Sequence, residues 1–347
     1  MRKLLLFVLA ALAAGGCATR PVAKPIAAQP LAPPAPYTRV ANPDTNTVQL
    51  QIALRKFVPA HQRGPAIWLA GTMHVGEPAY YHEVQKFLDK QTVVLYEGVN
   101  TGSHKNHVPG AKVDIKTESS PPPEMSSTNA GFSMQSQLAR SLGLVFQLDV
   151  IDYDRTNFLN SDLSILQIQR LMLDDPTAEL AQPGEPTRSN PTFDALLQIM
   201  DGSSFLGSMF KMGIQFIGAN PKLQALTKLT LIEAVGQLKG DFSSLRGVPP
   251  DLKKLLDVLI QARNENVIKD LKTEVKLVPK KGSIAVFYGT GHMDDMEKRL
   301  TSELDYRPTD DIWLTAFAVD MRTADVSPGE VQMMRNLVKW QMGEMQQ

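Results

Sequence analysis

The hydrophobic positions of this chain follow two periods, which predicts strands alternating with helices. Residues 48–54 carry apolar side chains at every second position, as in a half-buried strand, and residues 65–70 form a short apolar run. A polar turn at 61–64 separates these two segments, so we expect them to pair. The predicted strands cover residues 48–54, 65–70, 92–96, 145–151, 283–288 and 312–319.

Apolar residues at helical spacing predict helices between these strands. One helix begins at Pro78, a favourable first-turn residue, and carries Tyr81, Val84, Phe87 and Leu88 on one face. The predicted helices cover residues 78–88, 135–142 with Gly143 as its cap, 251–275 and 293–304. The alternation predicts an α/β fold, with a mixed, partly parallel β-sheet core and surrounding helices.

A large helical insertion interrupts this alternation. Residues 158–275 are mostly helical by periodicity, with loops near 176–191, 218–221 and 247–250. The insertion belongs to a single predicted domain at 46–325, and a C-terminal helix at 326–347 follows it.

Residues 100–130 have a different composition, rich in Gly, Ser, Pro and Lys. A segment of this kind predicts a long surface loop, either a functional lid or an insertion. His104 and His107 lie within it, at a spacing that suits a metal. Because no helical periodicity surrounds them, we interpret them as two solvated histidines.

The N-terminus has the pattern of a signal peptide. Arg2 and Lys3 precede an apolar run at 4–12 and small residues at 13–16. The run is too short for a transmembrane helix, which needs about 20 apolar residues. We therefore expect residues 1–16 to be cleaved off.

Cys17 is the only cysteine, so the chain cannot form an internal disulfide. Its place directly after the small residues resembles a lipobox, in which the thiol is acylated and several acyl chains give a stable anchor in membrane lipid. Ala14 departs from that motif, where Leu is commoner at the third position before the Cys. An ordinary signal peptide with an incidental cysteine is the alternative.

Residues 17–45 combine this anchor with a linker rich in Pro and Ala, which predicts an extended spacer. Ala18 in place of Asp after the cysteine fits sorting to an outer membrane. The expected location is therefore the cell envelope, with the protein lipid-anchored and facing the periplasm.

Charge and missing motifs narrow the function. Lys plus Arg equals Asp plus Glu at 36 each, without a basic run, which argues against nucleic acid as a partner. The chain has no Gly-x-Ser-x-Gly elbow, no phosphate loop and no His-Glu-x-x-His helix. Serine hydrolase, P-loop and common zincin chemistry are accordingly disfavoured.

Two segments share one pattern, a buried strand followed by Gly-x-x-His and then a helix. They are Gly71-Thr-Met-His74 and Gly289-Thr-Gly-His292. Glycine permits the sharp turn at the end of each strand and a close approach of backbone to ligand. Each histidine should project from the same edge of the sheet, where open α/β folds bind ligands.

Acidic residues follow other predicted strands and extend this cluster. Glu97 and Asp152 lie at two predicted strand ends, while Asp152 and Asp162 also fit ordinary turn chemistry. Neutral imidazoles and carboxylates together suit a divalent ion such as Zn²⁺, Mn²⁺ or Co²⁺. The residue types therefore predict a metal site.

The order and spacing of four elements resemble the TraB/GumN/Tiki superfamily over residues 48–320. These elements are Gly71-Thr-Met-His74, Leu95-Tyr-Glu97, Arg263-Asn264 and Gly289-Thr-Gly-His292. The resemblance implies a metal site of His74, Glu97 and His292, and a metal-dependent, peptidase-like hydrolase acting on a peptide or small molecule. Glu97, as ligand or general base, and Arg263 would be the catalytic residues. The chain departs from the pattern after His292, where relatives commonly continue with a Leu and then a Gly and this chain reads Met293-Asp294-Asp295. These acids could also simply cap the following helix.

Two other functions stay open. Related lipoproteins bind haem through tyrosine, and Tyr80, Tyr81, Tyr96 and Tyr288 lie near the predicted crevice. A haem- or ligand-binding lipoprotein is therefore one alternative, and an inactive scaffold relative is the other.

Overall fold

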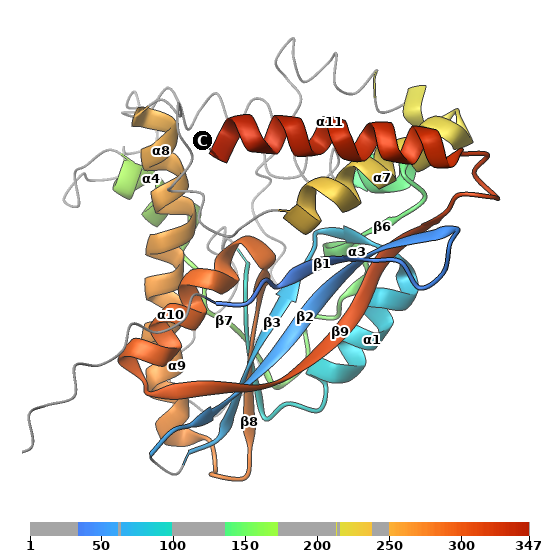
Figure 1. Ribbon diagram of the computed structural model, residues 1–347. Helices are drawn as coiled ribbons and strands as arrows, with labels where there is room; N and C mark the ends of the chain where they lie inside the picture. Colours follow the sequence, from blue (N-terminus) through green and yellow to red (C-terminus); the bar gives the residue numbers. More distant parts are fainter. Residues whose placement is uncertain are drawn as a thin grey trace, which may run out of the picture. The chain divides into compact units, whose positions relative to one another are not determined.

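The computed structural model describes residues 34–61, 64–98, 136–172, 213, 216–237 and 250–346. These residues form a mixed β-sheet with helices packed against it, which confirms the predicted α/β class (Figure 1). The segment at 100–130, its two histidines and Cys17 lie outside the described residues.

The main sheet has the strand order β1-β2-β3-β8-β5-β7, and β9 pairs with β2. Strands β3, β8, β5 and β7 run parallel to one another, whereas β1, β3 and β9 pair antiparallel with β2. The strand bounds are β1 Thr38–Ala41, β2 Thr47–Pro59, β3 Ala66–Thr72, β5 Val93–Tyr96, β7 Phe158–Asn160, β8 Ser283–Gly289 and β9 Tyr306–Asp320. A second, two-stranded sheet pairs β4 (Val75–Gly76) with β6 (Val145–Phe146).

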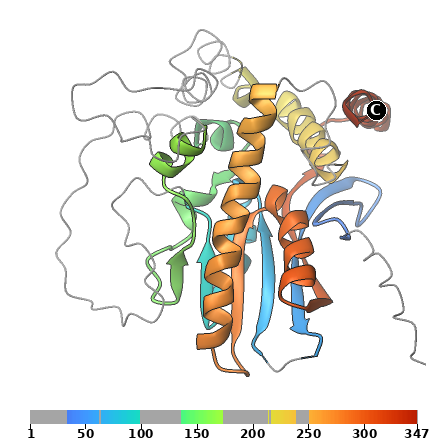
Figure 2. The same cartoon turned by 90° about the vertical axis from the view of Figure 1, so that its left-hand side faces the viewer.

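Helices cover both faces of the parallel strands, which is why β8 reads as a continuous apolar run. Alternate residues of β8 enter two separate hydrophobic clusters, Ala285 and Phe287 in one and Ile284, Val286 and Tyr288 in the other. The first cluster includes α1 (Pro78–Leu88) and α7 (Pro221–Gln237). The second includes α9 (Arg263–Leu277) and α10 (Met293–Glu303), which lie in front of the sheet in Figure 2.

Most predicted elements are present. The predicted pairing of 48–54 with 65–70 is confirmed by the β2–β3 ladder, in which Leu54 is opposite Ala70. The helix ending at Gly143 is also confirmed. Gly143 has a φ of +64°, and the N–H of Leu144 donates to the carbonyl of Ala139 at 2.8 Å, as in a glycine C-cap.

The predicted strand at 145–151 is wrong. Only β6 is extended there, and a helical turn, α3 (Gln147–Val150), follows it. Leu148 and Val150 are 43% and 41% exposed, so the alternation does not mark a buried face. The place beside β5 belongs to β7, which the periodicity assigned to the helical insertion because three residues are too few to show a period of two.

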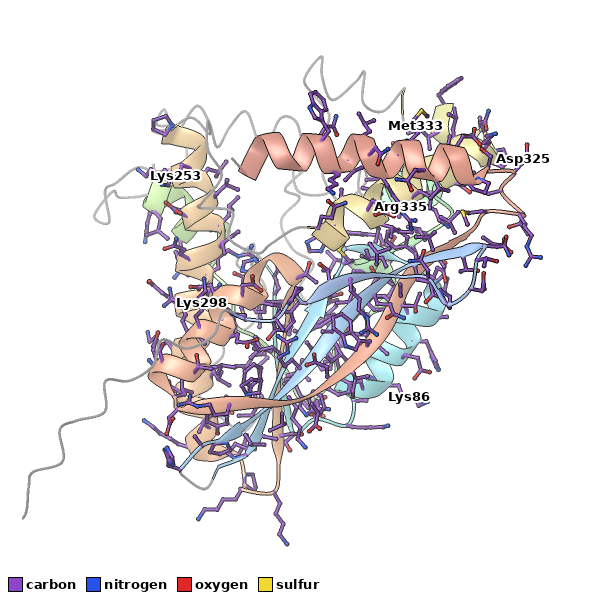
Figure 3. The ribbon with its side chains drawn as sticks, in the orientation of Figure 1. Lys86, Lys253, Lys298, Asp325, Met333 and Arg335 are labelled. Atoms are coloured by element: carbon purple, nitrogen blue, oxygen red, sulfur yellow. The ribbon has the colours of Figure 1, made fainter. Side chains whose placement is uncertain are left out.

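The described part of the 158–275 insertion is helical after β7. It contains α4 (Ile165–Met172), α7, and one long helix composed of α8 (Pro250–Asp257), a π-helical turn at Val258–Ala262 and α9. The C-terminal helix α11 (Pro328–Gln346) packs on α7, where Arg335 pairs with Glu233 at 2.6 Å. Figure 3 shows Arg335 on the α7 side of α11 and Met333 on the other side.

A buried cluster of charged side chains holds the segment around Tyr37 against the sheet. Arg55 on β2 pairs with Glu297 at 2.9 Å and with Asp311 at 2.8 Å, and its guanidinium lies over the ring of Tyr37. The Tyr37 hydroxyl donates to Glu297 at 2.7 Å, and Arg55 also donates to the carbonyl of Ala35. These contacts fix the chain where it enters the sheet.

Replacing Tyr37 with phenylalanine is expected to lower the free energy of unfolding by about 1.5–3 kcal/mol, because a hydrogen bond to a buried carboxylate is lost. Tyr306→Phe is the matched control, since its hydroxyl donates to the neutral carbonyl of Pro65, and it should cost about 0.5–1.5 kcal/mol. Urea unfolding of both variants measures the difference. Equal losses of unfolding free energy in the two variants would show that the hydrogen bond to Glu297 contributes no more than the one to Pro65.

Candidate functional site

The carboxyl ends of four parallel strands meet at one edge of the sheet. Thr72 at the end of β3 is in register with Gly289 at the end of β8, and Tyr96 at the end of β5 is in register with Asn160 at the end of β7. The chain segments leaving these strands carry His74, His292, Glu97 and Asp162. The predicted convergence of the two Gly-x-x-His motifs at one edge is therefore confirmed.

The space left by the missing side chain of Gly289 is where three of these residues meet. A Cβ at this position would lie 3.3 Å from Oε2 of Glu97, 3.9 Å from Nε2 of His74 and 3.9 Å from Cδ2 of His292. Gly289 itself has φ −53° and ψ 144°, which any residue adopts. Its glycine therefore serves the close approach of these groups and not a backbone turn.

Glu97 is the centre of the site. Its Oε1 accepts from Nη2 of Arg263 at 2.8 Å, and its Oε2 accepts from the backbone N–H of Gly289 at 2.7 Å. Burial alone raises the pKa of Glu97, but the charge of Arg263, with His292, His74 and the Gly289 N–H, lowers it to about 2. Glu97 is therefore ionised at neutral pH.

Arg263 is held by two carboxylates. It donates from Nε and Nη2 to both oxygens of Asp162, at 2.8 and 2.6 Å, in addition to its bond to Glu97. Asp162 also accepts from the backbone N–H groups of Gly98 and Leu163, and its side chain is fully buried. Burial lowers the pKa of Arg263, but Asp162 and Glu97 raise it above its usual value. The guanidinium thus orients Glu97. Its Nε and Nη2 groups are already used in hydrogen bonds to the two carboxylates.

The sequence pattern of Asp162 also fits ordinary turn chemistry, but the structure places this residue beside Arg263. The strand before it was assigned to a helix, so its position at the sheet edge was hidden. Asp152, the other weak candidate, is an exposed residue that pairs with Arg155 at 3.1 Å and does not join the site. The turn interpretation holds for Asp152.

The π-helical turn ends at Ala262, and α9 begins directly after it with Arg263 and Asn264. Turns of this type add one residue to a helix and occur often at functional sites. Both residues after it are buried and face the sheet edge, where Arg263 contacts Glu97 and Asn264 contacts His292.

His292 is buried, and both of its ring nitrogens have close neighbours. Nδ1 lies 2.7 Å from Oδ1 of Asn264, and Nε2 lies 3.7 Å from Oε1 of Glu97. The ring packs edge-on against Tyr288 at a centroid distance of 5.3 Å. Burial lowers the pKa of His292, and the opposing charge of Glu97 offsets this only in part, which favours the neutral ring.

His74 differs from His292 because its side chain is exposed. Its backbone is tied down, since the carbonyl of His74 accepts from the N–H of Gln147 at 2.8 Å. His74 is close enough to Glu97 for its charge to contribute to the lowered pKa of that carboxyl. It lies at the solvent side of the pair formed by Glu97 and His292.

The tyrosines proposed for haem are mostly engaged in the core. Tyr81 donates to the carbonyl of Met73 at 2.7 Å and Tyr288 to that of Ser161 at 2.6 Å. Tyr80 is buried with its hydroxyl 3.5 Å from that of Thr72. Tyr96 is half-buried and its ring packs against Tyr153.

The donor chemistry of the site suits a divalent ion. A neutral imidazole with Nε2 directed at an ionised carboxylate is a common ligand pair, and two ligands at 2.0–2.2 Å on a tetrahedral ion are about 3.4 Å apart. The separation of His292 Nε2 and Glu97 Oε1 is 3.7 Å. Within the described ranges no group of three or more His, Cys, Asp or Glu side chains is arranged to hold a metal ion. His74 would therefore have to turn inward to act as a third ligand.

Comparison of the chain with protein-family models, curated proteins and solved structures finds no significant match.

Proposed function

We propose that this chain is a divalent-metal-dependent hydrolase whose metal site consists of His74, Glu97 and His292. The observation that carries the proposal is the pair formed by Glu97 and His292. Oε1 of the ionised Glu97 carboxylate and Nε2 of His292, whose lowered pKa favours the neutral ring, lie 3.7 Å apart in a largely buried site. A divalent ion placed between these two atoms would be bound by both of them, while Arg263 keeps its contact with Glu97.

The protein's own residues would prepare this site in distinct ways. Glu97 would act as a ligand and not as a general base, because a carboxyl with a pKa of about 2 takes up protons poorly at neutral pH. Arg263 and the N–H of Gly289 would hold one Glu97 oxygen each and fix its orientation. A bound Zn²⁺, Mn²⁺ or Co²⁺ would supply Lewis-acid polarisation of a carbonyl and activation of water.

The substrate class rests on resemblance alone. The ordered motifs around His74, Glu97, Arg263 and His292 resemble those of the TraB/GumN/Tiki superfamily, which supports a peptidase-like reaction on a peptide or small molecule. We extend the proposal to an envelope protein anchored through acylated Cys17. In the described part of the chain no helix combines the length and apolar character needed to span a bilayer.

The direct test is metal binding by the purified full-length chain. We expect one equivalent of Co²⁺ to bind, with a visible spectrum typical of nitrogen and oxygen ligands, and Zn²⁺ to displace it. Absence of binding at micromolar metal would overturn the proposal. A Soret band in the isolated protein would instead favour the haem-binding alternative.

Gly289→Ala tests the geometry of the site with one added methyl group. Its Cβ would lie 3.3 Å from Oε2 of Glu97, and the backbone there accepts alanine, so we expect metal affinity to fall at least about 10-fold. Thermal unfolding should shift by only a few degrees. Gly329→Ala is the control, because its nearest neighbour would be Oγ of Ser327 at 4.0 Å. Unchanged metal affinity in Gly289→Ala would place the ion elsewhere.

A further inference from the structure

We infer that Asp295 and Asn264 form a positioning chain that fixes the tautomer of His292, with the proton on Nδ1 and the lone pair of Nε2 directed at Glu97. The inference deepens the proposed function, since what Nε2 binds rests on that proposal. The tautomer itself depends only on hydrogen bonds within the protein.

The orientation of the Asn264 amide follows from its partners. Its Nδ2 lies 2.9 Å from Oδ2 of Asp295 and 3.2 Å from the backbone carbonyl of His292. Both partners only accept hydrogen bonds, so the amide nitrogen must face them and the amide oxygen must face the imidazole. A flipped amide would place an oxygen against two acceptors.

That orientation decides where the imidazole proton is. Oδ1 of Asn264 lies 2.7 Å from Nδ1 of His292, and an amide oxygen can only accept. The ring therefore carries its proton on Nδ1. The opposite tautomer would bring two lone pairs together in a buried place, at the cost of a lost hydrogen bond.

Asp295 is the fixed end of the hydrogen-bonded series that runs through Asn264 to His292. Its Oδ2 also accepts from Nε of Arg299 at 2.7 Å, one turn further along α10. Arg299 lies within ion-pair distance of Glu265 and Glu303 as well, which keeps it near Asp295. Asp295 thus has a function beyond capping the helix.

The arrangement matches the way proteins orient metal-binding histidines. One ring nitrogen is held by a polar partner so that the other stays free for the ion, and loss of that partner typically lowers metal affinity about 10- to 100-fold. Here the partner is Asn264, and Tyr288 packs edge-on against the same ring. Both Asn264 and Asp295 are therefore positioning residues.

The tautomer can be measured in the metal-free, full-length protein by ¹⁵N NMR of its histidine side chains at mildly alkaline pH, with the His292 signals assigned from a His292→Phe variant. We expect an Nδ1–H ring in the native chain. Asn264→Leu, which removes the acceptor, should shift the ring towards Nε2–H. Finding Nε2–H in the native chain, or no change in Asn264→Leu, would overturn the inference.

A second variant keeps the test decisive if Asn264→Leu does not fold. Asp295→Leu changes a half-buried position and frees the Asn264 amide to flip. Both tautomers of His292 should then appear, and Co²⁺ affinity should fall about 10-fold or more. Glu303→Gln is the control, because it contacts Arg299 but not Asn264. A native Nδ1–H ring without metal binding would refute the proposed function and leave this inference intact.

Discussion

Replacing Arg263 with methionine is expected to destabilise the protein by about 3–5 kcal/mol, because it leaves two buried carboxylates without their cation. Arg263 is 8% exposed, Glu97 13% and Asp162 fully buried, and their contacts are 2.6 to 2.8 Å long. Arg263→Lys should recover only part of this loss, since an ammonium cannot reproduce the fork that binds Asp162. Urea unfolding gives the free energies.

The matched control is Arg155→Ala. This arginine also bridges two acidic side chains, Asp89 and Asp152, but it is 49% exposed, so its loss should cost no more than about 1 kcal/mol. Comparable losses of unfolding free energy in the Arg263 and Arg155 variants would show that burial does not strengthen the contribution of the Arg263 ion pairs.

The same cluster predicts a dependence on pH. Because the pKa of Glu97 is lowered to about 2 in the folded state from an ordinary 4.5, its contribution is fully present above the ordinary value. That contribution is lost as pH falls towards 2. In Arg263→Met the pKa depression should largely disappear, so the stability difference from the native protein should shrink under acid conditions.

The second large effect concerns His74, Glu97 and His292 as one unit. If the two histidines bind one ion, His74→Ala and His292→Ala should each lower affinity by more than the roughly 10- to 100-fold cost of losing an orienting partner. The double variant should add little, because residues that act together are not additive. Isothermal titration with Zn²⁺ and Co²⁺ measures each case.

Glu97→Gln separates two roles of the carboxylate in the same assay. A ligand would lose both metal and activity, whereas a general base would lose activity and keep the metal. The lowered pKa of Glu97 leads us to expect loss of both. His82→Ala is the control, since this histidine is exposed on α1. Independent, additive losses from His74 and His292 would contradict a shared ion.

The sequence alone was sufficient for the α/β class and for the meeting of the two Gly-x-x-His motifs. Strands covered on both faces appear as apolar runs, and parallel neighbours must end at the same edge, so the position of His74, His292 and Glu97 follows from local pattern and chain direction. These signals act over a few residues. They can be identified in the sequence without knowing which helices and strands pack against one another.

Only the tertiary structure decided which groups hold those residues in place. Asp162 follows a strand of three residues, too short to show a period, and its partner Arg263 is 101 positions away in the sequence. The chain from Asp295 through Asn264 to His292 likewise joins two helices. Buried polar groups must find partners wherever the fold brings them close, and that choice of partner is a property of the packing, not of any local segment.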